Sequence, residues 1–302
     1  MIDNQTASIK ARLKNIADAE HKPFDFILML YFVERFLYRL SISEYNDHFV
    51  LKGGLLLHTF MKEQARATKD VDLLARKITN DLDELKHIFV KIAEIESNDA
   101  IIYDKKNITT IRIKEDADYE GIRIKLTAYL GNVRKTLQFD IGFGDVIVPK
   151  PQTIEYPTLL DMKKPTIQTY SKESIVAEKF EAMLYLAEAN SRIKDFYDIY
   201  SLCMKYNFSG SVLFEAIKQT LAQRRTKLSD EPTIFLNEFI ENPDKQKQWT
   251  AFKHRANVAQ GIEFDEILQI IRIFLKPIFS AITENREFFG QWNCKSQEWN
   301  NP

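Results

Sequence analysis

Two aspartates separated by one residue, Asp70 and Asp72, are the side chains of this sequence best placed to do chemistry. In a β-strand, residues i and i+2 point to the same face, so these carboxylates would lie together, with Cα atoms roughly 6.5–7 Å apart. Two carboxylates at this spacing can converge on a pair of divalent ions about 3.5–4 Å apart. Mg²⁺ prefers oxygen ligands and is usually shared between carboxylates and substrate phosphates. Because two like charges on one strand face repel each other, the pattern predicts a bound cation.

A third carboxylate and a pair of glycines fit the same site. Alternation within Leu137–Ile141 places Asp140 on the polar face of a strand, where it would complete a three-carboxylate metal site beside the first two. Upstream, Gly53-Gly54 lets the backbone approach a phosphate and present its N–H groups. Each signal alone is weak, because Asp-x-Asp usually marks a solvated strand or loop and Gly-Gly is more often a turn. Their order along the chain predicts a metal site next to a phosphate-binding turn.

A lysine and two aspartates further along form a second candidate cluster. Lys179 lies off the apolar stripe of its expected helix, either as a solvated lysine paired with nearby glutamates or as a cation for a triphosphate. Asp195 and Asp198 are three residues apart and share a helix face. Pairing with Arg192 and Lys194 is the structural alternative; in the functional one, Asp195 positions Lys179 or the acceptor and Asp198 anchors the helix.

The elements that must position these residues fall into two regions. Helical periodicity runs through residues 5–40, β alternation dominates from 69 to about 148 with a helix at about 80–96, and the pattern beyond residue 165 is helical. We therefore predict the α+β class, with a domain boundary near residue 165. The polar tail after Trp292 is expected to be frayed.

Composition limits the function classes. With 45% hydrophobic residues the 302-residue chain can bury a real core, and its net charge of −1 gives no global signal for nucleic acid. Any nucleic-acid site must then be a local patch; residues 218–227 and 245–255 are two basic candidates. The two cysteines are expected to be unpaired thiols. The polar N-terminus and the charges within 24–40 predict a soluble cytoplasmic protein with no membrane partner.

Taken in order, the motifs resemble those of the AbiEii-type toxins of the nucleotidyltransferase superfamily. The resemblance rests on five segments: Phe49–Leu57 (FVLKGGLLL), Arg66–Leu73, Phe139–Asp145 with Val148-Pro149, Glu173–Met183 and Asn190–Asp198. It implies a mixed β-sheet flanked by helices as the catalytic domain, residues 1–165. An all-helical domain, residues 166–302, would complete the active site and bind the acceptor.

The resemblance also implies an activity and its residues. The activity is Mg²⁺-dependent transfer of a nucleotide from an NTP to an acceptor hydroxyl, in some relatives the 3′ end of tRNA, within a toxin–antitoxin or phage-defence system with a cognate antitoxin. Asp70, Asp72 and Asp140 would hold two Mg²⁺ ions, with Asp140 as base. The other catalytic residues would be Lys179 and Asp195. The nucleotide-binding residues would be Lys52, Gly53, Gly54, Arg66, Lys179 and Asp198.

One position departs from the pattern. Many nucleotidyltransferases carry Ser or Thr after the glycines, where its hydroxyl helps to hold the phosphates, and this chain has Leu55. Backbone amides would then hold the phosphate alone. Leu55 therefore keeps open a degenerate module that binds a nucleotide or partner without catalysis. Among enzymatic functions, transfer to a protein hydroxyl is the alternative to an RNA acceptor.

Overall fold

A computed structural model of the chain describes residues 2–61, 68, 70–116, 119–256, 258 and 261–300. The chain divides into two compact units. The sheet unit contains Met1–Thr59, Ala67–Gly144 and Gln152–Thr169, and the helical unit contains Phe60–Arg66, Asp145–Pro151 and Tyr170–Pro302. Each unit is described by itself.

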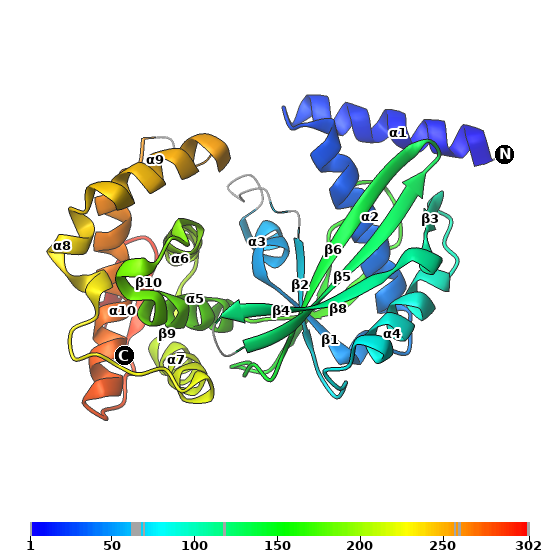
Figure 1. The fold of residues 1–302 in the computed structure, drawn as a ribbon. Helices are drawn as coiled ribbons and strands as arrows, with labels where there is room; N and C mark the ends of the chain where they lie inside the picture. Colours follow the sequence, from blue (N-terminus) through cyan, green and yellow to red (C-terminus); the bar gives the residue numbers. More distant parts are fainter. Residues whose placement is uncertain are drawn as a thin grey trace. The chain divides into compact units, whose positions relative to one another are not determined.

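The sheet unit is built on a mixed sheet of eight strands, in the order β3-β5-β6-β2-β1-β8-β7, with β4 also pairing with β5 (Figure 1). The strands are β1 (Phe49–Lys52), β2 (Asp70–Ala75), β3 (Ile101–Tyr103), β4 (Thr109–Asp116), β5 (Tyr119–Leu130), β6 (Val133–Phe143), β7 (Gln152–Glu155) and β8 (Thr166–Thr169). The β2·β6 and β1·β8 pairs are parallel and the others antiparallel, which confirms the predicted mixed sheet. Because β8 pairs with β1, the sheet continues past the boundary predicted at residue 165.

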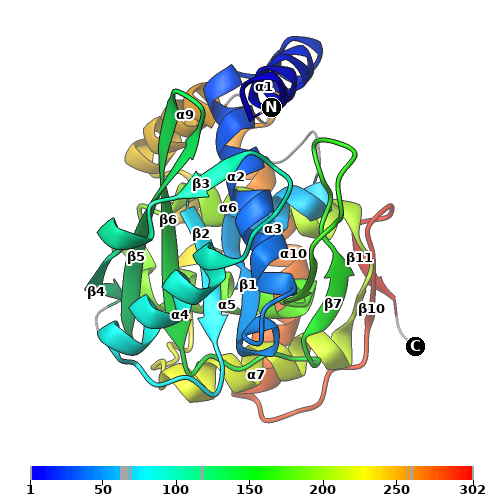
Figure 2. The ribbon, with the colours of Figure 1, turned by 90° about the vertical axis from the view of Figure 1, so that its right-hand side faces the viewer.

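Helices cover one face of this sheet, and α2 and α4 lie in front of the strands in Figure 2. The helices of the unit are α1 (Ile2–Ala19), α2 (Phe24–Ser41), α3 (Gly53–Met61) and α4 (Leu82–Glu94), with short 3₁₀ turns at Asn46–His48 and Lys105–Asn107. Asp81 caps α4 by accepting hydrogen bonds from the backbone N–H groups of Asp83 and Glu84. The core between helices and sheet is aromatic. The ring centroid of Phe139 lies 4.5 Å from that of Phe36 and 5.1 Å from that of Phe89.

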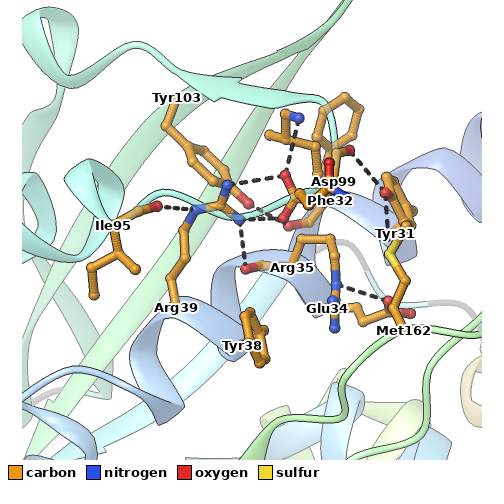
Figure 3. Close-up of polar contacts among 12 residues, drawn as sticks. Tyr31, Phe32, Glu34, Arg35, Tyr38, Arg39, Ile95, Asp99, Tyr103 and Met162 are labelled. Atoms are coloured by element: carbon orange, nitrogen blue, oxygen red, sulfur yellow. Dashed lines mark hydrogen bonds and ion pairs between the residues drawn. The ribbon is translucent and has the colours of Figure 1, made fainter. Parts of the chain in front are cut away.

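Three charged residues of α2, Glu34, Arg35 and Arg39, are buried and paired (Figure 3). Arg39 binds Asp99 through two hydrogen bonds of 2.6 and 3.0 Å, and Arg35 Nε lies 3.0 Å from a carboxylate oxygen of Glu34. Tyr31 donates to the Asp99 carbonyl at 2.9 Å. Buried charges are tolerated only when paired in this way, so the network fixes α2 to the chain around Asp99. No helix among the described residues is long and apolar enough to cross a membrane.

The helical unit contains the predicted C-terminal helices and also a small sheet. Its helices are α5 (Lys172–Leu186), α6 (Ile193–Lys205), α7 (Gly210–Arg224), α8 (Asn237–Ile240), α9 (Pro243–Ala256) and α10 (Phe264–Thr283), with 3₁₀ turns at Ala187–Ala189 and Thr233–Phe235. The antiparallel strands are β9 (Phe208–Ser209), β10 (Gln291–Asn293) and β11 (Glu298–Asn300). Both cysteines are free thiols, as predicted.

The expectation that the tail after Trp292 is frayed is wrong. The tail forms the β10–β11 hairpin, which two tryptophans attach to the helices. Trp292 is buried and donates to the carbonyl of Cys203 at 2.7 Å, while Trp299 stacks on Phe274 with ring centroids 5.6 Å apart. The large apolar area of these two side chains outweighs the polar composition of the tail.

Candidate active site

Asp70 and Asp72 lie on β2, with β1 on one side and β6 on the other. Both residues are partly exposed, whereas Val71 and Leu73 between and after them are buried at 1% exposure. This alternation confirms the prediction of a strand with its two carboxylates on one face.

Three residues in register extend this face across the neighbouring strands. Asp72 pairs with Lys52 of β1 on one side and with Asp140 of β6 on the other. Paired residues of adjacent strands point to the same face, so the row Lys52–Asp72–Asp140 lies on one surface. Asp140 therefore stands beside Asp72, as predicted. Lys52 is buried at 5% exposure, so it is no ordinary surface lysine.

An arginine that sequence reasoning missed holds the third carboxylate. Arg123 of β5 is the register partner of Asp140, and its guanidinium binds both carboxylate oxygens at 2.8 Å. These hydrogen bonds raise the pKa of Arg123 against the effect of burial, and the negative charges of Asp140, Asp70 and Asp72 raise it further. The signal was present in the alternation of β5, which puts Arg123 on the polar face opposite the apolar positions.

Gly53 begins α3 with its backbone in the left-handed region, at φ +68°. A β-carbon there would lie 1.8 Å from Oδ2 of Asp72, so only glycine lets the start of the helix approach this carboxylate. The first N–H groups of a helix are anion-binding groups, which is the role predicted for Gly53 and Gly54. Leu55 is buried at 1% exposure, so its position offers a core side chain and no hydroxyl.

The second predicted cluster is formed within the helical unit. Lys179 of α5 lies 2.5 Å from Asp195 and 2.8 Å from Asp198, both on α6. Arg192 also pairs with Asp195, at 2.8 Å, as the structural alternative predicted. The interpretation of Lys179 as a solvated lysine is wrong, because its side chain is only 11% exposed and its partners are aspartates.

Electrostatics keep Asp195 ionised. Its side chain is 1% exposed, and burial by itself would raise the pKa of the carboxyl group. The positive charges of Lys179 and Arg192 act more strongly in the opposite direction and leave the pKa of Asp195 below its usual value. A buried lysine held between two carboxylates is positioned with little freedom.

A family model for the AbiEii nucleotidyl transferase toxins of type IV toxin–antitoxin systems matches residues 35–270. The chain belongs to this family. The match covers both aspartate clusters, and membership of a type IV toxin–antitoxin family implies an antitoxin partner.

Two solved structures from Helicobacter pylori have folds similar to this AbiEii-family chain. JHP933 is 17% identical, with a TM-score of 0.45 over 83% of this chain and 90% of its own. A protein named as a candidate nucleotidyltransferase is 15% identical, with a TM-score of 0.48 over 87% of this chain and 97% of its own. No curated protein matches the chain.

The predicted site residues of the AbiEii-family chain thus fall into two groups. The sheet unit brings together Lys52, Gly53, Gly54, Asp70, Asp72 and Asp140. The helical unit brings together Lys179, Asp195 and Asp198. Arg66, predicted to contact phosphate, lies outside the described residues.

Three residues of the two predicted RNA-binding runs belong to the interior of the helical unit instead. Arg224 is paired with Asp145 at 3.1 Å and with Glu181 at 2.9 Å, and its side chain is 11% exposed. Lys245 is buried and donates to backbone carbonyls, and Trp249 is completely buried. These three residues offer no surface to an RNA backbone.

Proposed function

We propose that this AbiEii-family protein is a Mg²⁺-dependent nucleotidyltransferase that moves a nucleotide from an NTP to the hydroxyl of an RNA acceptor. The observation that carries the proposal is the carboxylate row of the sheet unit. Asp72 and Asp140 are register partners on adjacent strands, with Asp70 two residues away on the same face. Gly53, at the N-terminus of α3, is packed directly against the Asp72 carboxylate.

The donor set fits Mg²⁺ shared with a nucleotide. Asp70 and Asp72 offer hard oxygen ligands. Among the described residues, no group of three or more His, Cys, Asp and Glu side chains is placed to hold a metal ion, so the predicted three-carboxylate site is not assembled while Arg123 binds Asp140. Mg²⁺ is usually bound by one or two carboxylates and by substrate phosphates, and rarely by an all-protein cage. When bound, it would neutralise and orient the triphosphate. We propose two such ions, with Asp140 as the third ligand once Arg123 releases it.

The protein's own residues supply the remaining functions. The N–H groups at the start of α3 bind the phosphates, with Lys52 beside them adding positive charge. Asp140 accepts the proton of the acceptor hydroxyl. The acceptor oxygen forms a bond to the α-phosphorus, the bond from that phosphorus to the β-phosphate oxygen breaks, and pyrophosphate leaves. In the helical unit, Asp195 and Asp198 hold Lys179 in position, and we propose this lysine as a phosphate-binding cation of that unit.

Transfer of label tests the proposal directly. The purified protein is incubated with Mg²⁺, total tRNA and each of the four NTPs labelled at the α-phosphate. We expect label in RNA from the wild type and from Asp18→Asn, an exposed control on α1, and a loss of at least 10²-fold in Asp72→Asn. Label in protein with none in RNA would instead establish a protein hydroxyl as acceptor. No labelled product under any of these conditions would contradict transferase activity.

A non-catalytic nucleotide binder is the second candidate, and the buried Leu55 favours it because no hydroxyl is present at that position. The two functions differ in their need for metal. In calorimetry, a transferase site binds NTP tightly only with Mg²⁺ and loses this binding in Asp70→Asn. NTP binding that depends on neither Mg²⁺ nor Asp70 would favour the binder.

A further inference from the structure

The long β5–β6 hairpin has two very different faces (Figure 1). On the core face, eight residues are buried at 1% exposure or less: Ile122, Ile124, Leu126, Ala128, Leu130, Leu137, Phe139 and Ile141. The opposite face carries the register pairs Arg123–Asp140, Lys125–Gln138, Thr127–Thr136 and Tyr129–Arg134. Because Asp140 is also the register partner of Asp72, this polar face continues the candidate active site along the hairpin.

The charged side chains on this face are mostly positive. Lys125, Arg134 and Thr136 are exposed, and Tyr129 is partly exposed. Among the described residues of the two strands on this face, Asp140 is the only acid, and Arg123 already binds it. Arg134 lies six positions before Asp140 along β6, which corresponds to about 20 Å of strand. The face is therefore a positively charged strip that begins at the carboxylates.

Exposed aliphatic side chains border the strip. Ile102 of β3 pairs with Tyr129 and is 67% exposed, and Ile111 of β4 pairs with Arg123 and is 50% exposed. Cations interleaved with aromatic and apolar side chains fit unpaired nucleotides, whose phosphates bind Lys and Arg while their bases stack on flat or apolar surfaces. A duplex presents its bases stacked and hidden, so it gains little from the apolar border.

We propose that the strip formed by Lys125, Tyr129, Arg134 and Thr136 binds the single-stranded 3′ end of the RNA acceptor and leads its terminal hydroxyl to Asp140. The choice of RNA rests on the proposed function, whereas the location rests on charge and on continuity with the carboxylate row. The strip positions the acceptor and takes no part in the bond-forming step.

RNA binding without metal or NTP tests the strip separately from catalysis. The probe is a fluorescent 12-nucleotide single-stranded RNA, measured by anisotropy at several salt concentrations. We expect the double variant Lys125→Gln/Arg134→Gln to bind at least tenfold more weakly. The slope of log K against log salt should fall by about 1.4, because two phosphate contacts at about 0.7 each are lost. The matched control, Lys86→Gln/Lys91→Gln on α4, removes the same charge from another element.

A second pair of variants tests stacking. Tyr129→Ala should weaken binding of the same RNA at least fivefold, while Tyr129→Phe, which keeps the ring, should stay within twofold of the wild type. Equal effects of the Ala and Phe variants would contradict the stacking role.

The outcomes separate the strip from the proposed function. If the wild type transfers label to RNA and the double variant binds RNA as tightly as its control, RNA binding by the strip is refuted and the transferase activity is supported. If the double variant and Tyr129→Ala lose RNA binding although the wild type consumes no NTP, RNA binding by the strip is supported and the transferase activity is refuted. If the wild type does not bind the RNA at all, the proposal that the strip binds RNA is refuted.

Discussion

Replacing Gly53 by alanine should disable the carboxylate row while leaving most of the fold intact. An added β-carbon would lie 1.8 Å from Oδ2 of Asp72, and contacts below 3.0 Å essentially never occur, so this oxygen must retreat by at least 1.2 Å. Displacement of a reacting group by about 1 Å costs roughly 10²-fold in rate. That factor corresponds to about 2.7 kcal/mol of transition-state stabilisation.

Gly261→Ala is the control for backbone strain. Gly261 also has a left-handed backbone, at φ +78°, but an added β-carbon there meets nothing within 4 Å. Gly261→Ala should lose about 1–2 kcal/mol of unfolding free energy in urea titrations, and Gly53→Ala should lose at least as much because the clash with Asp72 adds to the backbone strain. In the label-transfer assay, Gly53→Ala alone should lose about 10²-fold. Activity of Gly53→Ala within threefold of Gly261→Ala would refute the argument that the position of Asp72 sets the rate.

Three further substitutions test the charge pairs of the sheet unit. Arg123→Gln removes a cation that competes with Mg²⁺ for Asp140. Two unit charges 4 Å apart repel each other by ~1 kcal/mol even in water. Removing this repulsion should make Mg²⁺ binding, measured by calorimetry, at least fivefold tighter. Unchanged or weaker binding would contradict the competition. Arg39→Met leaves the buried Asp99 carboxylate without its guanidinium and should lower the unfolding free energy by about 3–5 kcal/mol, measured in urea at pH 7. A loss below 1 kcal/mol would show that this pair is replaceable. Burial raises the pKa of Glu34 from its ordinary 4.5 to about 7, so the folded state binds a proton more tightly than the unfolded chain. Stability should therefore fall by about 3 kcal/mol as pH rises from 4.5 to 7 and then level off, and Glu34→Gln should remove the part of the slope that comes from this group. An identical slope in this variant would refute the assignment.

The sequence was sufficient for the parts of the fold that depend on local periodicity. Alternation put Asp140 on the polar face of its strand, and β6 does place it beside Asp72. In the large sheet, sequence periodicity did not reveal β3, β7 and β8, which are three or four residues long and too short for a period to appear. Pairing partners also stayed hidden, because register between strands distant in the sequence is set by the whole topology.

Burial explains the wrong predictions about charged residues. A run of basic letters cannot show which side chains find carboxylates or carbonyls elsewhere in the chain. Arg224 is buried by partners that lie 43 and 79 residues away in the sequence. Lys125 and Arg134 belong to no basic run, yet register puts them on one exposed face. A local charge count therefore included side chains that are buried, such as Arg224 and Lys245. The alternation of residues along a strand, combined with the register between strands, indicates a further exposed basic face.

Charge balance also changes the reasoning from which the metal site was predicted. Like charges on one strand face were expected to require a bound cation, but the chain supplies cations of its own. Lys52 stands in register with Asp72, and Arg123 binds Asp140 through both carboxylate oxygens. These cations offset part of the repulsion within the carboxylate row, and on the proposed function Mg²⁺ binding would replace Arg123 at Asp140. On the proposed function, such an exchange would leave Arg123 available for a new anion when the site is loaded, and a phosphate of the incoming nucleotide would supply that anion.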